Sequence, residues 1–187
     1  PPPPPPPPPP PYLQLPRPPR STRVGIRRQR QMCIRDRSDI ISEPLRHLRA
    51  DLTTTDQTAL VEQTLREVDL PIDFADRLPR QLSGGQAQRV AIARALVAEP
   101  DMLLLDEAAS ALDVLVAGQI LTLLETLQKE RQLALLFITH DLAVAKQLCH
   151  RIAVMHQGEI IEEGPTEQVI ATPAHPVTQK MVAATRS

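Results

Sequence analysis

The chain has 187 residues, and its 22 acidic and 21 basic side chains leave a formal net charge of −1. It holds only 3 aromatic residues and 2 cysteines, too few for a base-stacking surface or a disulfide framework. No apolar run approaches the ~20 residues that a membrane-spanning helix needs, and the amino end does not read as a signal peptide. The cysteine content suits a reducing compartment.

The first 37 residues differ in composition from the rest. They begin with an unbroken proline run over 1–11 and carry eight arginines against one acidic residue. A proline run adopts an extended helix without internal hydrogen bonds, so the segment is a disordered tail, a ligand for proline-recognising modules or a basic arm. Residues 32–37 also back-translate to a string that resembles a sequencing-library adaptor. We expect residues 1–37 to be a low-complexity segment, non-native or disordered, outside the fold.

The remaining residues carry 21 acidic against 13 basic side chains, which argues against a broad nucleic-acid-binding surface. Residues 38–98 have a helical pattern. Apolar side chains recur at spacings of three and four over 60–68, and Pro71 ends that helix because proline cannot continue it. A second helix is expected over 84–98, with Ser83 as its N-cap.

The pattern changes after residue 100. Continuous apolar runs at 102–105 and 133–139 predict two strands, and 112–127 between them has helical periodicity. Alternating strands and helices of this kind imply a parallel sheet covered on both faces. The other expected elements are a closing strand pair and two terminal helices, at 151–155, 159–161, 166–170 and 177–184. We therefore expect an α/β fold, with a helical layer over 38–98 ahead of a sheet-containing part over 99–187.

Two of the predicted strands end in ionisable pairs, Asp106–Glu107 and His140–Asp141. Ligands of open α/β sheets bind beyond the carboxyl ends of the strands. One carboxylate there can hold a hydrated magnesium ion while the next orients or deprotonates a water. Acids also follow strands simply as turn residues, and a histidine at such a junction can be a solvated bystander, so the pairs alone leave both interpretations open.

The predicted helix at 84–98 begins with Ser83-Gly84-Gly85-Gln86. A serine N-cap and two glycines leave backbone N–H groups uncovered at the positive end of the helix dipole. Such a helix start can bind phosphate oxygens, although a glycine-rich helix entry is also common without any ligand.

Leu82 to Arg89 (LSGGQAQR) resembles the signature motif of ATP-binding cassette (ABC) proteins. The segments that follow match the family in order: 102–107 resembles the Walker B strand, 110–113 the D-loop and 139–141 the switch-histidine region. The resemblance covers residues 38–187. It implies the carboxyl-terminal part of a P-loop NTPase (RecA-like) cassette, with the signature in the helical subdomain.

The resemblance also implies roles for the residues at these motifs. Ser83, Gly84 and Gly85 are expected to contact the γ-phosphate of an ATP bound mainly by an opposite subunit, in a head-to-tail sandwich of two cassettes. Gln86 is expected to shape the same loop. Asp113 is expected to link the two active sites across the dimer interface.

The catalytic roles fall on the strand ends. By resemblance, Asp106 holds Mg²⁺ through water, and Glu107 is the general base or water-orienting carboxylate. His140 is expected to hydrogen-bond the γ-phosphate and the attacking water. The implied reaction is phosphoryl transfer to water, in which catalysis is mainly positioning and charge stabilisation.

The sequence departs from the family pattern in two respects. Ala108 and Ala109 stand where the family usually has proline and threonine, which we expect to have a modest effect. No G-x-x-x-x-G-K-[S/T] occurs in the sequence, so the P-loop that cradles the ATP phosphates is missing. We predict that the chain as given neither holds ATP in a complete site nor hydrolyses it.

Three short segments, 40–45, 162–166 and 175–178, resemble those of oligopeptide, dipeptide and nickel importer ATPases. This resemblance implies a subunit peripheral to the inner face of a bacterial membrane. Its helical layer would dock onto a permease, a second ATPase subunit would complete the dimer, and a solute-binding protein would deliver the cargo. The alternatives are an ABC protein that acts on ribosomes or DNA, and an incomplete cassette that serves as a non-catalytic binding module.

Overall fold

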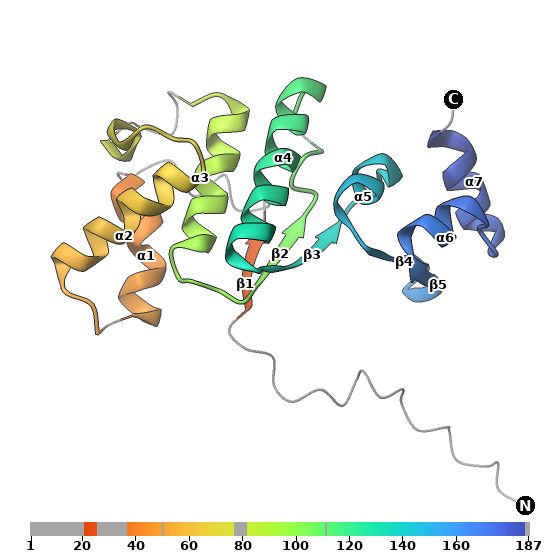
Figure 1. The fold of residues 1–187 in the computed structure, drawn as a ribbon, viewed down its shortest axis with the longest axis horizontal. Coiled ribbons are helices and arrows are strands. Elements are labelled where there is room, and N and C mark those ends of the chain that lie inside the picture. Colours follow the sequence, from red (N-terminus) through yellow and green to blue (C-terminus); the bar gives the residue numbers. More distant parts are fainter. Residues whose placement is uncertain (1–20, 26–36, 50, 77–81, 111, 186–187) are drawn as a thin grey trace, which may run out of the picture.

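The computed structural model describes residues 21–25, 37–49, 51–76, 82–110 and 112–185 (Figure 1). Its elements in chain order are β1 (Ser21–Gly25), α1 (Arg37–Leu48), α2 (Thr54–Glu67), η3 (Ile72–Asp76), α3 (Gly84–Leu96), β2 (Met102–Asp106), α4 (Val114–Arg131), β3 (Ala134–Ile138), α5 (Leu142–Leu148), β4 (Arg151–His156), β5 (Glu159–Pro165), α6 (Thr166–Ala171) and α7 (Pro176–Thr185).

Three strands form a parallel sheet in the order β1-β2-β3. β2 lies in the middle, with Leu104 opposite Leu136 of β3. β1 differs from the expectation for residues 1–37, because Ser21–Gly25 pairs with β2 along its whole length, and α1 begins at Arg37. The pairing with β2 is a tertiary effect, and five residues in a basic, proline-rich context give no periodic signal of it. Residues 1–20 and 26–36 lie outside the described residues.

One face of this sheet is buried and the other is open. Leu103 and Leu105 of β2 are fully buried, whereas Leu136 and Ile138 of β3 are 54% and 48% exposed on the opposite face. The prediction that helices cover both faces is therefore wrong for β3 in the part of the chain that the structure describes. The open side of β3 lines a largely apolar groove of about 840 Å³, together with residues of α5 and β4.

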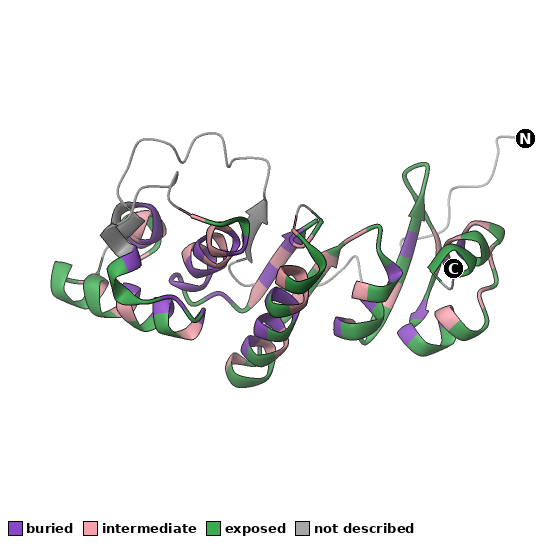
Figure 2. Cartoon of the chain, turned by 90° about the horizontal axis from the view of Figure 1, so that it is seen from above, coloured by how far each residue is buried: buried purple, intermediate pink, exposed green. Residues whose placement is uncertain are grey.

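The helical layer packs beside the sheet and holds half of the buried hydrophobic side chains (Figures 1 and 2). α1, α2 and α3 contact one another, and fully buried residues such as Ile41, Leu65 and Leu96 fill the space between them. Burying each of these side chains contributes about 1.5–3 kcal/mol. This layer gives α3 its fixed position relative to the sheet.

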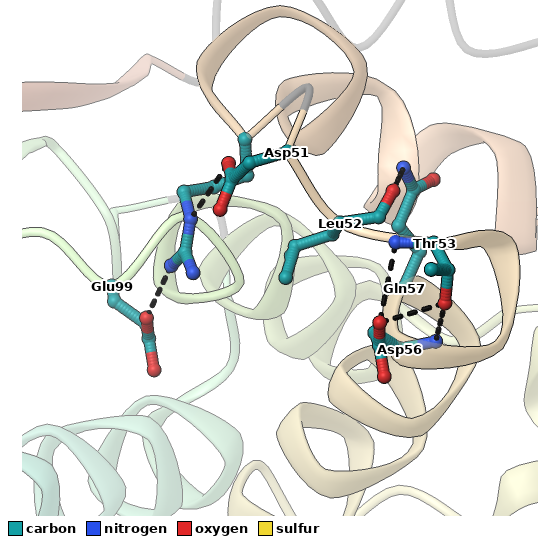
Figure 3. Close-up of polar contacts among 7 residues, drawn as sticks. Asp51, Leu52, Thr53, Asp56, Gln57 and Glu99 are labelled. Carbon is teal, nitrogen blue, oxygen red and sulfur yellow. Dashed lines mark hydrogen bonds and ion pairs between the residues drawn. The ribbon is translucent and has the colours of Figure 1, made fainter.

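Side-chain caps decide where α2 begins. The Thr53 hydroxyl accepts a hydrogen bond from the Asp56 N–H, and the Asp56 carboxylate accepts one from the Thr53 N–H. The side-chain amide of Gln57 donates to the Leu52 carbonyl (Figure 3). A reciprocal cap of this kind satisfies two backbone donors that the helix leaves unpaired. It starts α2 within the predicted helical region, immediately after the turn that follows α1.

The carboxyl-terminal part is built on the antiparallel pair β4–β5, against which α6 packs. Glu162 of β5 ties down α7, because its carboxylate accepts the Ala174 N–H at 2.9 Å and the His175 N–H at 3.0 Å. These backbone hydrogen bonds lower the pKa of Glu162 below its usual range. The segment with the importer-like sequence at 175–178 is thus the capped start of a helix.

Candidate functional site

The amino end of α3 is exposed and partly uncapped. The Ser83 hydroxyl accepts the Gln86 N–H at 3.3 Å, and the Gln86 side chain accepts the Ser83 N–H at 3.1 Å. Helix geometry leaves the N–H groups of Gly84 and Gly85 without an intrahelical partner, and the helix dipole makes this end positive. Ser83 and Gly84 are both exposed, whereas Gly85 is buried. The helix start therefore presents free donors of the kind that binds an anion, and Gln86 shapes its turn.

Glycine at position 85 lets α3 approach α4 closely. A Cβ on Gly85 would lie 2.5 Å from Val116 Cγ1, and one on Gly84 would lie 3.2 Å from Leu112 Cδ2. Asp113 caps α4 by accepting the Val116 N–H at 3.0 Å. The residues that the sequence assigns to the signature and the D-loop therefore meet where the amino ends of α3 and α4 touch.

Glu107 and His140 lie together at the carboxyl ends of β2 and β3. His140 Nδ1 is 3.3 Å from Glu107 Oε1, within hydrogen-bond distance, and both side chains are exposed. The two strands are neighbours in the sheet, and the Glu107 N–H donates to the Ile138 carbonyl at 2.9 Å. The pairing of the strands thus places the carboxylate and the imidazole side by side.

A left-handed turn aims the Glu107 side chain. Its φ is +50°, a region that non-glycine residues rarely adopt, and Ser110 Oγ donates to the Glu107 carbonyl at 3.0 Å to hold it. This role of Ser110 is not among the sequence predictions, although a serine in a turn directly after a strand is a common turn signal. Ala108 at the proline position of the family is buried, so this substitution fills the turn with a small apolar side chain.

Asp106 is the last residue of β2 and is exposed beside Glu107. Within the described ranges, no group of three or more His, Cys, Asp or Glu side chains could hold a metal ion. Mg²⁺ often takes only one or two carboxylates and completes its shell with water and substrate phosphate. A single carboxylate at the strand end fits that mode of binding, with phosphate oxygens as the necessary further ligands.

Comparison with known proteins shows the family of this chain. The family model described as "ABC transporter" matches residues 15–110, which is half of the chain. The chain belongs to the ABC transporter family. The match begins inside residues 1–37 and extends through the signature, the Walker B strand and Glu107.

Curated relatives are similar to this chain over most of its length. The glutathione import ATP-binding protein GsiA of Escherichia coli is 47% identical over 146 residues, 78% of this chain and 23% of the relative. A "Probable peptide ABC transporter ATP-binding protein" of Sinorhizobium fredii is 46% identical over 145 residues, 78% of this chain and 41% of the relative. The chain thus spans less than half the length of these relatives.

Among solved structures, cbiO1 from Clostridium perfringens, part of the ABC transporter complex cbiONQ, superposes with a TM-score of 0.70 at 28% identity. The superposition covers 81% of this chain and 59% of that one. The α/β fold with a helical layer that carries the signature is therefore that of an ABC cassette, as the sequence predicts. In the portion of the chain with described structure, none of the helices has the length and apolar character to cross a membrane.

Proposed function

We propose that this chain is the signature-bearing part of an ATP-hydrolysing subunit of an ABC importer, with peptides or nickel as the cargo. The observation that carries the proposal is the exposed, donor-rich start of α3, which touches the start of α4 at Gly85 and Val116. Two of the relatives are described as peptide and glutathione transport ATP-binding proteins, which favours a peptide-like cargo over nickel.

In this proposal, the catalytic residues lie at the carboxyl ends of β2 and β3. Glu107 orients or deprotonates the attacking water, and His140, 3.3 Å away, holds the γ-phosphate and the same water. Asp106 would hold Mg²⁺ through water, and the ion would supply positive charge against the transferring phosphoryl group. Because both Glu107 and His140 are exposed, they can reach a nucleotide that is presented from outside this chain.

The proposed ATP site is shared between two subunits. This chain contributes a signature edge, Ser83 to Gly85, to an ATP that the P-loop of a partner cassette holds. The sequence given holds no P-loop motif, so we expect that this chain alone neither binds ATP in a complete site nor hydrolyses it. Asp113, beside the α3 start, lies where it can connect the two sites of such a dimer.

The remaining partners follow from the family. A permease in the bacterial inner membrane would take up the helical layer formed by α1, α2 and α3 from the cytoplasmic side, and a solute-binding protein would supply the cargo from the other side. In the proposed complex, that permease would attach the chain to the membrane.

Calorimetric titration of the full chain with Mg-ATP tests the first part of the proposal. We expect no micromolar binding and no turnover. Micromolar binding accompanied by hydrolysis that Glu107→Gln abolishes would show that the chain is a complete enzyme by itself. Sedimentation of the chain with an intact peptide-type cassette tests the second part, since association should require ATP and should be lost in Ser83→Arg. Association without ATP, or none with it, would contradict the proposal.

A further inference from the structure

Arg131 lies where three helices end. It is the last residue of α4, Glu67 is the last residue of α2, and Leu96 is the last residue of α3. Arg131 Nη2 is 2.5 Å from Glu67 Oε2, and Arg131 Nη1 donates to the Leu96 carbonyl at 3.2 Å. One guanidinium therefore joins the carboxyl ends of all three helices.

The charges at this junction favour a cation. Each helix carboxyl end carries the equivalent of about half a negative charge, and Glu67 adds a full one. The Arg131 and Glu67 side chains are only 20% and 22% exposed, so solvent screens this pair less than the exposed ion pairs of the molecule. The planar guanidinium can serve the carboxylate and the carbonyl at once, which a lysine ammonium does with less fixed geometry.

The Arg131 contact adds a polar tie to the apolar packing that joins α3 and α4. The helices touch at their amino ends through Gly85 and Val116 and at their carboxyl ends through Leu96 and Arg131, so they run parallel, as Figure 1 shows. From Gly85 to Leu96, α3 rises about 16 Å, and from Val116 to Arg131, α4 rises about 22 Å. The difference of about 6 Å matches an arginine side chain that leans back toward the amino end of its helix.

We infer that Arg131 is a positioning residue that sets the register of α3 against α4, and with it the place of the Ser83–Gly85 edge beside Asp113. The inference rests on the proposed function for its meaning, since that edge is the part offered to a partner's ATP. Without the Arg131 contacts, α3 and α4 would keep their apolar packing and the close approach at Gly85 but would lose the polar tie between their carboxyl ends. A shift of α3 along α4 would then move the amino end of α3 relative to the start of α4.

The test measures the position of α3 directly, without any nucleotide. The full chain receives spin labels at Ala87 of α3 and Gln119 of α4, in a background where Cys33 and Cys149 are replaced by serine. Pulsed electron paramagnetic resonance then reports the distribution of distances between the two labels. We expect a single narrow distance peak for the otherwise unchanged chain.

Three variants decide the inference. Arg131→Met keeps the apolar stem but removes both contacts, and we expect loss of the narrow peak and a shift to longer distances. Arg131→Lys, which keeps the charge and is the gentler change for folding, should give an intermediate width. Lys129→Met is the matched control, since it removes the exposed ion pair with Glu125 on the same helix, and its peak should stay unchanged.

A narrow, unshifted peak in Arg131→Met, whatever its melting temperature, would overturn the inference, because the residue would then add stability without setting the register. If the distance peak in Arg131→Lys were as narrow as in the unchanged chain, the simultaneous contact of the guanidinium with Glu67 and Leu96 would not be what sets the register. If the peak broadened in Lys129→Met, the positioning role could not be assigned to Arg131. Since no ATP is present, failure of the proposed function in the sedimentation experiment leaves these results readable on their own.

Discussion

The glycine at position 85 should not tolerate even a methyl group. A Cβ there would lie 2.5 Å from Val116 Cγ1, a distance that real Cβ contacts do not reach. Val116 cannot easily turn away, because a β-branched side chain in a helix has one strongly preferred rotamer. Gly85→Ala therefore forces α3 and α4 apart at the point where the proposed phosphate-binding edge meets Asp113.

Gly118 on α4 provides the matched control, because a Cβ there meets nothing within 4 Å. In both variants the alanine gains up to about 1 kcal/mol of helix propensity. In Gly85→Ala overpacking, which typically costs about 1–3 kcal/mol, opposes this gain, so we expect a net loss of up to about 2 kcal/mol. Gly118→Ala should gain up to about 1 kcal/mol, so the same chemical change has opposite signs at the two positions.

Urea denaturation followed by circular dichroism measures both free energies of unfolding, and thermal melts should move by about 2–4 °C per kcal/mol. A second change, Val116→Ala, removes the clashing methyl groups and should restore part of the loss in Gly85→Ala, which a double-mutant cycle reports as a coupling energy. If Gly85→Ala were as stable as Gly118→Ala, or if the two changes were additive, the close contact between α3 and α4 would be refuted.

Three further predictions concern single residues elsewhere. Gln132 ends α4 with a φ of +53°, so Gln132→Gly should raise the free energy of unfolding by about 0.5–1 kcal/mol; a loss in urea denaturation would contradict this. Hydrogen bonds lower the pKa of Glu162, so its stabilising effect should be present above the unfolded-state pKa of about 4.3 and fade as the pH falls through the lower folded-state value. The melting-temperature difference between the unchanged chain and Glu162→Gln should accordingly shrink from pH 6 to pH 3, and a constant difference would refute the role of the carboxylate. Burial raises the pKa of the Cys149 thiol, so alkylation of this thiol at pH 8 should be slower in the folded chain than in urea. Peptide mass spectrometry measures both rates, and equal rates would count against the burial of Cys149.

The sequence predicts the elements that have strong local signals. The apolar run at 102–105 becomes β2 over Met102–Asp106, and Ser83 caps α3 as expected because its hydroxyl and the following glycines define a helix start locally. Helix ends were less accurate: α4 was expected over 112–127 and runs over Val114–Arg131. Its last turn lacks the apolar periodicity on which the prediction rested, and Arg131 is held there by contacts with α2 and α3.

The parts that the sequence does not predict depend on contacts between distant segments. β1 is a strand because β2 pairs with it, which no pattern within Ser21–Gly25 indicates. The 3.3 Å approach of His140 to Glu107 could be expected only as a shared sheet edge, since the neighbour relation of β2 and β3 sets the distance. The junction at Arg131 has no sequence signal, because an arginine at a helix end is ordinarily a solvated residue. The division into 1–37, 38–98 and 99–187 as separate units stays a prediction.

We propose that the start of α3 binds the terminal phosphate of an ATP held by another subunit. The most direct measurement is ATP hydrolysis by an intact cassette whose own signature has been inactivated, mixed with this chain. We expect that adding the chain restores turnover and that Ser83→Arg reduces it by at least ~100-fold, as for loss of a transition-state hydrogen-bond donor. Glu107→Gln should leave turnover unchanged, because the ATP in question is held and hydrolysed by the P-loop and carboxylate of the intact cassette. Restored turnover that depends on Glu107 and is indifferent to Ser83 would refute the proposed role of the α3 start.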